Sequence, residues 1–340
     1  MAASHQILEF TEIARLRDCI ESVSISVVDD RIAAGSLAGD VMVISKANTF
    51  ALPFEHDFGV GAVAWSPTSS VLATGGMDGV VRLWSDSNGH ATVASGKGWV
   101  AGITWRQDGK EFAAAIGKQV VRLAVGGVAD CNESARHDFE STATCLAYTT
   151  NGQRLGVGSY GGVSWFETGD KIVRHFPWKG APLTISMSPN GKWVATGNQD
   201  ASIHCWKLWS GDDLQMSGYE TKIQHLDWDL NSRYLAVGSV ADISLWDFSG
   251  RGPKGSKPIQ LAGHARHVVA LKYQPQSQLI MSVGAEGTVC IWKPSSGKQS
   301  LVANVNIGEE PTCATWSRDG LSIIVGTALG GVFEVDAHVI

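Results

Sequence analysis

The sequence alternates short β-like runs with turns, as residues 63–84 (VAWSPTSSVLATGGMDGVVRLW) illustrate. In the first run, the larger Val63 and Trp65 alternate with Ala64 and Ser66, which is the period of a half-buried strand. A short apolar run, VLAT, comes next, and a third run, VVRLW, follows a Gly/Asp-containing turn. No stretch keeps a 3.6-residue period over twelve residues, and residues 10–18 (FTEIARLRD) predict at most a short turn of helix.

This three-run pattern recurs eight times, at spacings of 39 to 45 residues. In each repeat a bulky residue is followed ten positions later by Gly or Ala, with Val283 as the one exception. The bulky positions are Ile25, Trp65, Trp105, Tyr148, Met187, Trp228, Tyr273 and Trp316. Four-stranded units of this length, rich in Gly and Trp, are typical of β-propeller blades, so the repeat predicts an all-β propeller.

The two ends of the chain predict how the propeller closes. Each internal repeat is followed by one more extended stretch, the expected outermost strand, but the eighth ends near Val335 and the chain stops at Ile340. The segment His5–Phe10 (HQILEF) precedes the first repeat, so we expect it to complete the last blade and remove an open sheet edge. We therefore predict one domain over residues 1–340, with residues 1–18 as closing strand and connector. Eight blades fit better than seven, the alternative, which would leave one repeat unused.

Two repeats carry a recurring set of polar and aromatic residues. The second has His56, Ser66-Pro67, Thr74, Asp78 and Trp84, and the seventh has His264, Ser282, Glu286 and Trp292. Only one literal Trp-Asp pair occurs, Trp246-Asp247. These residues resemble the WD40-repeat family, and the drifted repeats resemble its bacterial-type members. The resemblance implies a structural relay rather than a catalytic set: the His contacts the turn acid, and the strand hydroxyl reaches the Trp nitrogen.

The relay is incomplete in most repeats. The fifth keeps Thr196, Asp200 and Trp206 but has Trp178 in the place of the His. Other residues at the His place are Gly96, Phe139, Tyr219 and Ile307. We expect these blades to be held together by packing instead.

Composition and charge narrow the class of protein. The chain has 340 residues, of which 44% are hydrophobic and 18% charged, with a net charge of −6. The negative charge makes nucleic acid an unlikely partner, and the lack of an apolar run of about 18 residues argues against a membrane span. The six cysteines form no CxxC pair, and the N-terminus does not look like a secretory signal, so we expect free thiols and a cytoplasmic location.

Motifs of catalytic and cofactor sites are weak. Gly156–Gly161 (GVGSYG) matches the GxGxxG spacing, but it joins two predicted strands, whereas a dinucleotide site needs a following helix. The ten histidines contain no HxH or HExxH motif. We therefore predict no enzyme activity and no catalytic, cofactor or metal-binding residues. The alternative is a metal or small-ligand site at the mouth of the propeller channel, in an enzyme or a metal-homeostasis accessory protein.

The remaining candidates are exposed positions on one face of the propeller. In such folds the loop before each first strand and the turn between the second and third strands share a face. The candidate interaction residues there are Phe58, Trp99, Tyr160, Trp178, Lys222, Arg266, His267, Glu309 and Glu310. Aromatic residues and Arg are favoured at interaction hot spots, although Trp99 and Trp178 could instead wedge between blades. We predict a scaffold for protein–protein interaction that is monomeric by itself and binds a protein partner of unknown identity.

Overall fold

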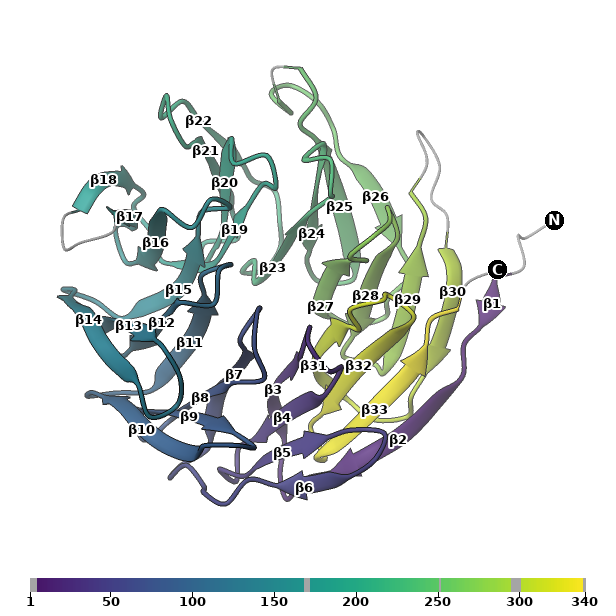
Figure 1. Cartoon of the computed structure of the whole chain (residues 1–340). Coiled ribbons are helices and arrows are strands. Elements are labelled where there is room, and N and C mark those ends of the chain that lie inside the picture. The colour runs from purple at the N-terminus through teal and green to yellow at the C-terminus, as the bar shows by residue number, and fades with distance from the viewer. Residues whose placement is uncertain (1–4, 168–171, 251, 295–300, 339–340) are drawn as a thin grey trace. The chain divides into compact units, whose positions relative to one another are not determined.

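The computed structural model describes residues 5–167, 172–250, 252–294 and 301–338, and these residues form an eight-bladed β-propeller (Figure 1). The described strands form eight separate sheets, one for each repeat, so the eight-bladed prediction is confirmed over the seven-bladed alternative. Within the described ranges there is no helix long and apolar enough to cross a membrane.

The first four blades are built from consecutive strands. Blade 1 contains β3 (Ile20–Ile25), β4 (Ile32–Ser36), β5 (Val41–Ile44) and β6 (Thr49–Ala51). Blade 2 contains β7 (Val60–Trp65), β8 (Leu72–Gly76), β9 (Val80–Ser85) and β10 (Gly89–Ser95). Blade 3 contains β11 (Val100–Trp105), β12 (Glu111–Ile116), β13 (Gln119–Val125) and β14 (Cys131–Asp138). Blade 4 contains β15 (Ala143–Tyr148), β16 (Arg154–Ser159), β17 (Gly162–Glu167) and β18 (Ile172–Pro177).

The last four blades follow the same order, except that the eighth borrows a strand. Blade 5 contains β19 (Pro182–Met187), β20 (Trp193–Asn198), β21 (Ile203–Lys207) and β22 (Asp213–Met216). Blade 6 contains β23 (His225–Trp228), β24 (Tyr234–Gly238), β25 (Asp242–Asp247) and β26 (Ile259–Ala262). Blade 7 contains β27 (Val268–Tyr273), β28 (Ile280–Gly284), β29 (Thr288–Trp292) and β30 (Leu301–Asn306). Blade 8 contains β31 (Pro311–Trp316), β32 (Ser322–Thr327), β33 (Gly331–Asp336) and the N-terminal β2 (Phe10–Arg15).

The chain groups into two compact units. One covers residues 16–185 and holds blades 1 to 4, and the other covers residues 1–15 and 186–340 and holds most of blades 5 to 8. The boundary falls within β19. The expectation of one domain over the whole chain therefore stays a prediction.

The eight bulky positions of the repeat have one structural role. Each of them is the last residue of the first strand of a blade. Three of the indoles also join neighbouring blades, because Trp105 donates to the carbonyl of Ala64 at 3.0 Å and Trp316 to that of Lys272 at 3.0 Å. Trp228 does the same with the carbonyl of Ser186 at 3.4 Å. The side chain that fills the space between blades thus also satisfies its own buried donor.

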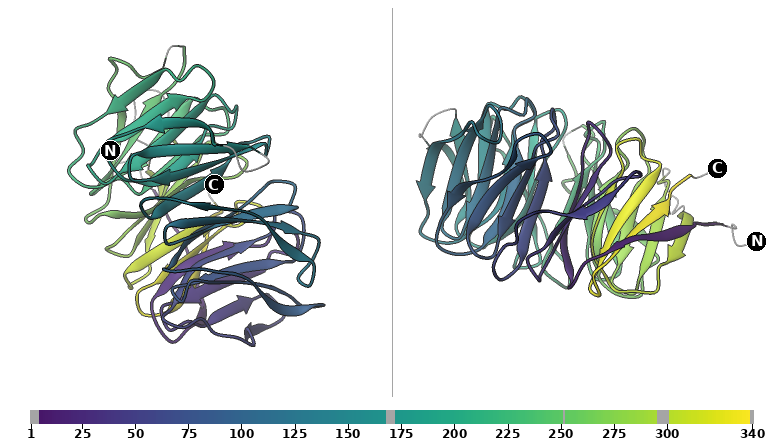
Figure 2. Two further views of the ribbon diagram at one scale, coloured as in Figure 1. Left: turned by 90° about the vertical axis from the view of Figure 1, so that its left-hand side faces the viewer. Right: turned by 60° about the horizontal axis from the view of Figure 1, so that its bottom comes forward.

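The N-terminal segment completes the last blade, as predicted, but through different residues. Strand β2 pairs antiparallel with β33, and the two run side by side in Figures 1 and 2. The predicted closing stretch, His5–Phe10, instead contributes β1 (Gln6–Ile7), which pairs parallel with β30 of blade 7.

The prediction of a helical turn in residues 10–18 was wrong for a specific reason. The register of β2 shifts between Glu12 and Ala14, so Ile13 is an extra residue in the strand. Such a bulge breaks the two-residue alternation and gives the apolar side chains a spacing that imitates a helix. Phe10 confirms the strand by packing on Phe333, with ring centroids 6.0 Å apart.

Candidate functional site

Blade 7 contains a continuous chain of buried hydrogen bonds. The indole Nε1 of Trp292 donates to Ser282 Oγ at 2.8 Å, and that hydroxyl lies 2.7 Å from Nε2 of His264. Nδ1 of His264 lies 2.7 Å from Oε1 of Glu286. Because a carboxylate can only accept, a neutral imidazole donates from Nδ1 and accepts the serine proton at Nε2. Burial raises the pKa of Glu286, but the hydrogen bond from His264, backbone N–H donors and the nearby imidazole together outweigh burial and hold that pKa below its ordinary value.

Blade 2 brings the equivalent residues together differently. His56 Nε2 lies 2.9 Å from Thr74 Oγ1, and Nδ1 lies 3.3 Å from the Asp78 carboxylate. Arg82 Nη1 is closer to the same Nδ1, at 2.7 Å. Burial lowers the pKa of His56, and the nearby guanidinium adds to this against the pull of Asp78. Trp84 is buried and makes ring contacts with Trp65 at 6.2 Å, so in this blade the aromatic residue contributes by packing.

Blade 5 does not assemble a relay from Thr196, Asp200 and Trp206. Thr196 donates to the carbonyl of His204 at 3.4 Å, and Asp200 accepts from Ser202 at 2.5 Å. The ring of Trp206 packs on that of His204, with centroids 4.2 Å apart. Without a histidine between the blades, Thr196 and Asp200 each have a partner within their own blade.

In both blades that contain the histidine relay, the residue just before the turn between the second and third strands is a glycine. The motif analysis missed this position. A Cβ placed on Gly284 would clash with the Glu286 carboxylate and with Nδ1 of His264, and one on Gly76 would clash with Asp78 and His56. In five blades without the histidine, the equivalent position carries a polar side chain: Ser36, Ser159, Asn198, Ser239 and Thr327. The exchange of Gly for a polar residue was visible in the sequence as a signal of relay loss.

Blade 3 holds a buried ion pair that the motif analysis also missed. Arg122 Nη2 donates to Glu111 Oε1 at 2.7 Å, and both residues are buried. The hydroxyl of Tyr148 donates to the same oxygen at 2.8 Å. Burial, and then the neighbouring carboxylate, raises the pKa of Tyr148 well above its ordinary value. The set is fully paired, which fits a structural role for these charges.

The unit of blades 1 to 4 displays exposed aromatic side chains. Phe58 is 83% exposed, Trp99 65% and Tyr160 68%, and we call these three residues the aromatic rim. Trp178 is half-buried, and its backbone N–H donates to the carbonyl of Gly161 at 2.9 Å.

Backbone hydrogen bonds hold the aromatic rim. The N–H of Met77 donates to the carbonyl of Gly59 at 2.8 Å, and the N–H of Gly117 donates to that of Trp99 at 2.9 Å. The N–H of Tyr160 donates to Ser141 Oγ at 3.0 Å. The turn between the second and third strands is thus tied to the loop before the first strand, and the rim side chains stand on well-anchored backbone.

The charged candidates belong to the unit of blades 5 to 8. Arg266 and Glu310 pair at 3.2 Å and are each about half exposed, while Lys222 and His267 are exposed. Glu309 is different, because its carboxylate accepts from Thr327 Oγ1 at 2.5 Å and from Arg15 at 2.7 Å, and its side chain is 17% exposed. Glu309 thus links Arg15 of β2 to Thr327 of β32 within blade 8, which corrects the expectation that it is an exposed contact residue.

The described residues contain no group of three or more His, Cys, Asp or Glu placed to hold a metal ion. None of the six cysteines, all of which lie in the described ranges, forms a disulfide bond. Burial raises the pKa of Cys131 to about 11 and, with a further contribution from Glu286, that of Cys290 to about 12. Thiols held in the protonated form are poor nucleophiles.

Comparisons with known proteins agree with this architecture. The profile described as "WD domain, G-beta repeat" matches residues 49–85, 169–207 and 255–293. The chain is 25% identical to the "Protein LST8 homolog" of Drosophila melanogaster, over 66% of this chain and 75% of that protein. It is 24% identical to human "F-box-like/WD repeat-containing protein TBL1X", over 66% of this chain but only 34% of that protein.

Solved structures extend the likeness to nearly the whole chain. Sqt1 from Chaetomium thermophilum superposes with a TM-score of 0.80 at 18% identity, covering 97% of this chain and 100% of that one. A second structure, of Sqt1 bound to the N-terminus of the ribosomal protein L10, gives a TM-score of 0.81 at 17% identity, covering 97% and 100%. All these relatives are eukaryotic, so they do not support the expected bacterial-type resemblance. Three of its repeats match the WD repeat profile and its sheets form the blades of a β-propeller, so the chain is similar to WD40-repeat β-propeller proteins.

Proposed function

We propose that the chain is a non-catalytic scaffold that binds a protein partner through the aromatic rim. The observation that carries this proposal is the exposure of Phe58, Trp99 and Tyr160 within one compact unit. Large aromatic side chains are rarely left in water without a use, and they dominate binding energy where they become buried at an interface. Because their backbone is already hydrogen-bonded in turns, little conformational entropy is lost on binding.

Two further observations support a binding role. The relay residues and the buried ion pair are engaged in internal hydrogen bonds, so they are already used to hold blades together. WD40 propellers typically mediate protein interactions, and the related Sqt1 fold has been seen with the N-terminus of L10. We further propose that the chain works in the cytoplasm and is monomeric by itself.

The test is affinity capture of the tagged chain at low expression, with companions quantified by mass spectrometry. The variant Phe58→Ala/Trp99→Ala/Tyr160→Ala should lose one dominant companion by at least about tenfold, because the removed side chains supply the buried contacts. The control is Leu329→Ala, which removes an exposed apolar side chain from the other unit. Equal recovery with both variants would contradict the proposal, and so would turnover of a small substrate by the purified protein.

A further inference from the structure

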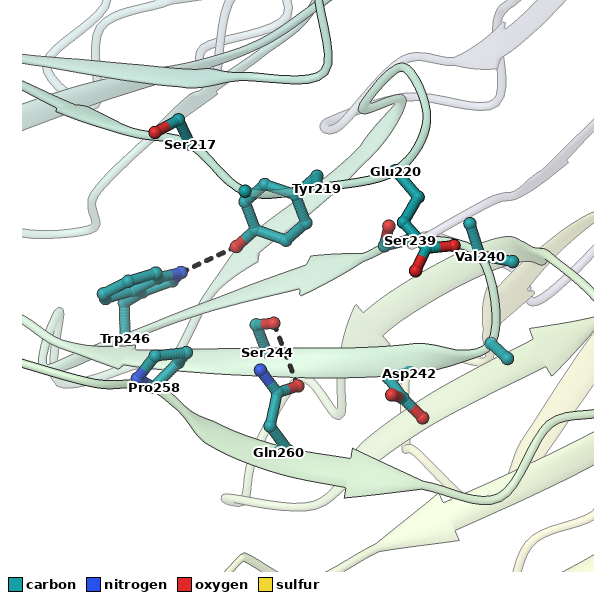
Figure 3. A pocket seen from close by; sticks show the side chains of 12 residues that line it. Ser217, Tyr219, Glu220, Ser239, Val240, Asp242, Ser244, Trp246, Pro258 and Gln260 are labelled. Carbon is teal, nitrogen blue, oxygen red and sulfur yellow. Dashed lines mark hydrogen bonds between the residues drawn. The ribbon is translucent and has the colours of Figure 1, made fainter.

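Blade 6 contains a cavity where blade 7 has its relay. The cavity measures about 400 Å³ and lies between the segment after β22, the turn after β24 and the strands β25 and β26 (Figure 3). All of its lining residues belong to the unit of blades 5 to 8. Its volume is within the range of pockets that hold small ligands or single side chains.

Loss of the relay accounts for the opening. Trp246 is kept, but Tyr219 stands in the place of the histidine, Val237 in that of the hydroxyl residue and Ala241 in that of the turn acid. The indole Nε1 of Trp246 donates directly to the Tyr219 hydroxyl at 2.8 Å. The Tyr219 hydroxyl therefore accepts the indole hydrogen bond that the serine accepts in blade 7, and no histidine is needed between them. The small side chain of Ala241 leaves the place of the turn acid open to solvent.

The cavity has an aromatic end and an acidic end. In Figure 3, Trp246 and Pro258 lie toward one side, and the carboxylates of Glu220 and Asp242 lie toward the other. Between them, Ser244 is buried and donates to Gln260 Oε1 at 3.1 Å.

Both carboxylates are available to a ligand. Glu220 and Asp242 are exposed, and neither makes an ion pair with any residue in the described ranges. The exposed lysines of the β25–β26 loop, Lys254 and Lys257, form no ion pair with them either.

We propose that this cavity binds the arginine side chain of a peptide. An apolar stem fits the aromatic end, and a positive charge fits the acidic end, where it meets two unpaired carboxylates. A guanidinium suits the acidic end better than an ammonium, because its planar fork of five donors can pair with more than one carboxylate oxygen, whereas an ammonium is a point charge. The site lies in a different compact unit from the aromatic rim, so it goes beyond the proposed function and can fail independently of it.

The experiment is a titration of the full chain labelled with ¹⁵N-tryptophan, followed by the indole N–H resonance of Trp246, which a Trp246→Phe sample assigns. The probe is N-acetyl-arginine N-methylamide. We expect a saturable shift of that resonance, weaker with the lysine analogue and absent with the citrulline analogue, which has the same shape without the charge. Equal shifts with arginine and citrulline would overturn the proposal. Tighter binding of free L-arginine than of the blocked probe would overturn the peptide source.

Two variants test whether the arginine probe binds inside the blade 6 cavity. Glu220→Gln/Asp242→Asn should weaken the arginine probe at least about tenfold, because both charge-assisted contacts are removed. Ala241→Leu should abolish the shift by filling the cavity, and the dispersed Trp246 resonance reports that the blade is still folded. The matched control is Glu140→Gln, which removes an exposed charge in the other unit and should leave the titration unchanged. Unchanged binding in the double variant would place the probe elsewhere and contradict the proposal.

Discussion

Blades 6 and 7 are consecutive, have the same four-stranded topology and belong to the same compact unit, yet they are stabilised in different ways. In blade 7 a histidine links a strand serine to a turn glutamate, and the indole of Trp292 completes the chain. In blade 6 a tyrosine accepts directly from Trp246. The difference teaches that the indole of a blade can be satisfied by different hydrogen-bond partners, and that the exchange of partner in blade 6 is accompanied by a cavity.

The largest difference in stability between variants of the two blades should appear at the residue just before the turn between the second and third strands, which is Gly284 in blade 7 and Ser239 in blade 6. We expect Gly284→Ala to destabilise the protein by about 3 kcal/mol, because the added Cβ clashes with His264 and Glu286 and forces their hydrogen bond apart. Ser239→Ala, at the equivalent position of blade 6, should change the free energy of unfolding by no more than about 0.5 kcal/mol. Urea denaturation measures both values, and equal effects would refute the assignment of this glycine.

Removing the central residue of each hydrogen-bond chain should give the next largest effect. His264→Ala leaves Ser282 and Glu286 without their buried partner, so we expect a loss of about 2 to 3 kcal/mol. Tyr219→Phe removes a single hydrogen bond and should cost about 1 kcal/mol. Thermal and chemical unfolding of the two variants side by side provide the measurement. A larger loss in blade 6 than in blade 7 would contradict the account.

Acid should affect the two blades in separate ranges of pH. Burial, together with nearby His267, lowers the pKa of His225 in blade 6 to about 4. The unfolded chain takes up this proton near the ordinary histidine value, so stability is complete above that value and falls as the pH drops toward 4. We expect a loss of about 2 kcal/mol between about pH 7 and pH 5.

In blade 7 the lowered pKa of Glu286 acts at lower pH. Its contribution is present above the ordinary carboxyl range and is lost as the pH falls through the lowered value. Unfolding of the wild type and of His225→Gln across this range separates the two effects. A wild-type curve that the substitution leaves unchanged between pH 7 and pH 5 would show that His225 does not titrate as described.

Much of the fold could be predicted from the sequence, because the same pattern of strands and turns occurs in all eight repeats. Each bulky residue, from Ile25 to Trp316, ends the first strand of its blade. The closing strand was harder to place, since the bulge at Ile13 disguises a strand as a helical turn. Its partner strand lies more than 300 residues away in the sequence, so local pattern could not supply the register.

The candidate sites were less predictable, because they depend on contacts between blades. The exposure of Phe58 was expected, and Trp99, for which the sequence left open a place between blades, is exposed as well. Glu309 was assigned to the surface although it pairs with Arg15 and Thr327. No motif marks the cavity of blade 6, because it arises from residues that are missing from the relay. Its one sequence signal is the coincidence of Tyr219 and Ala241 with the places of the histidine and the acid.

The account's central claim is that the chain recognises a protein through the aromatic rim. Hydrogen–deuterium exchange of the complex with its dominant companion tests this most directly. We predict slowed exchange in peptides that contain Phe58, Trp99 and Tyr160, with the relay of blade 7 equally protected in the free and bound states. Protection confined to other surfaces, with the three rim peptides exchanging as fast as in the free protein, would contradict the claim.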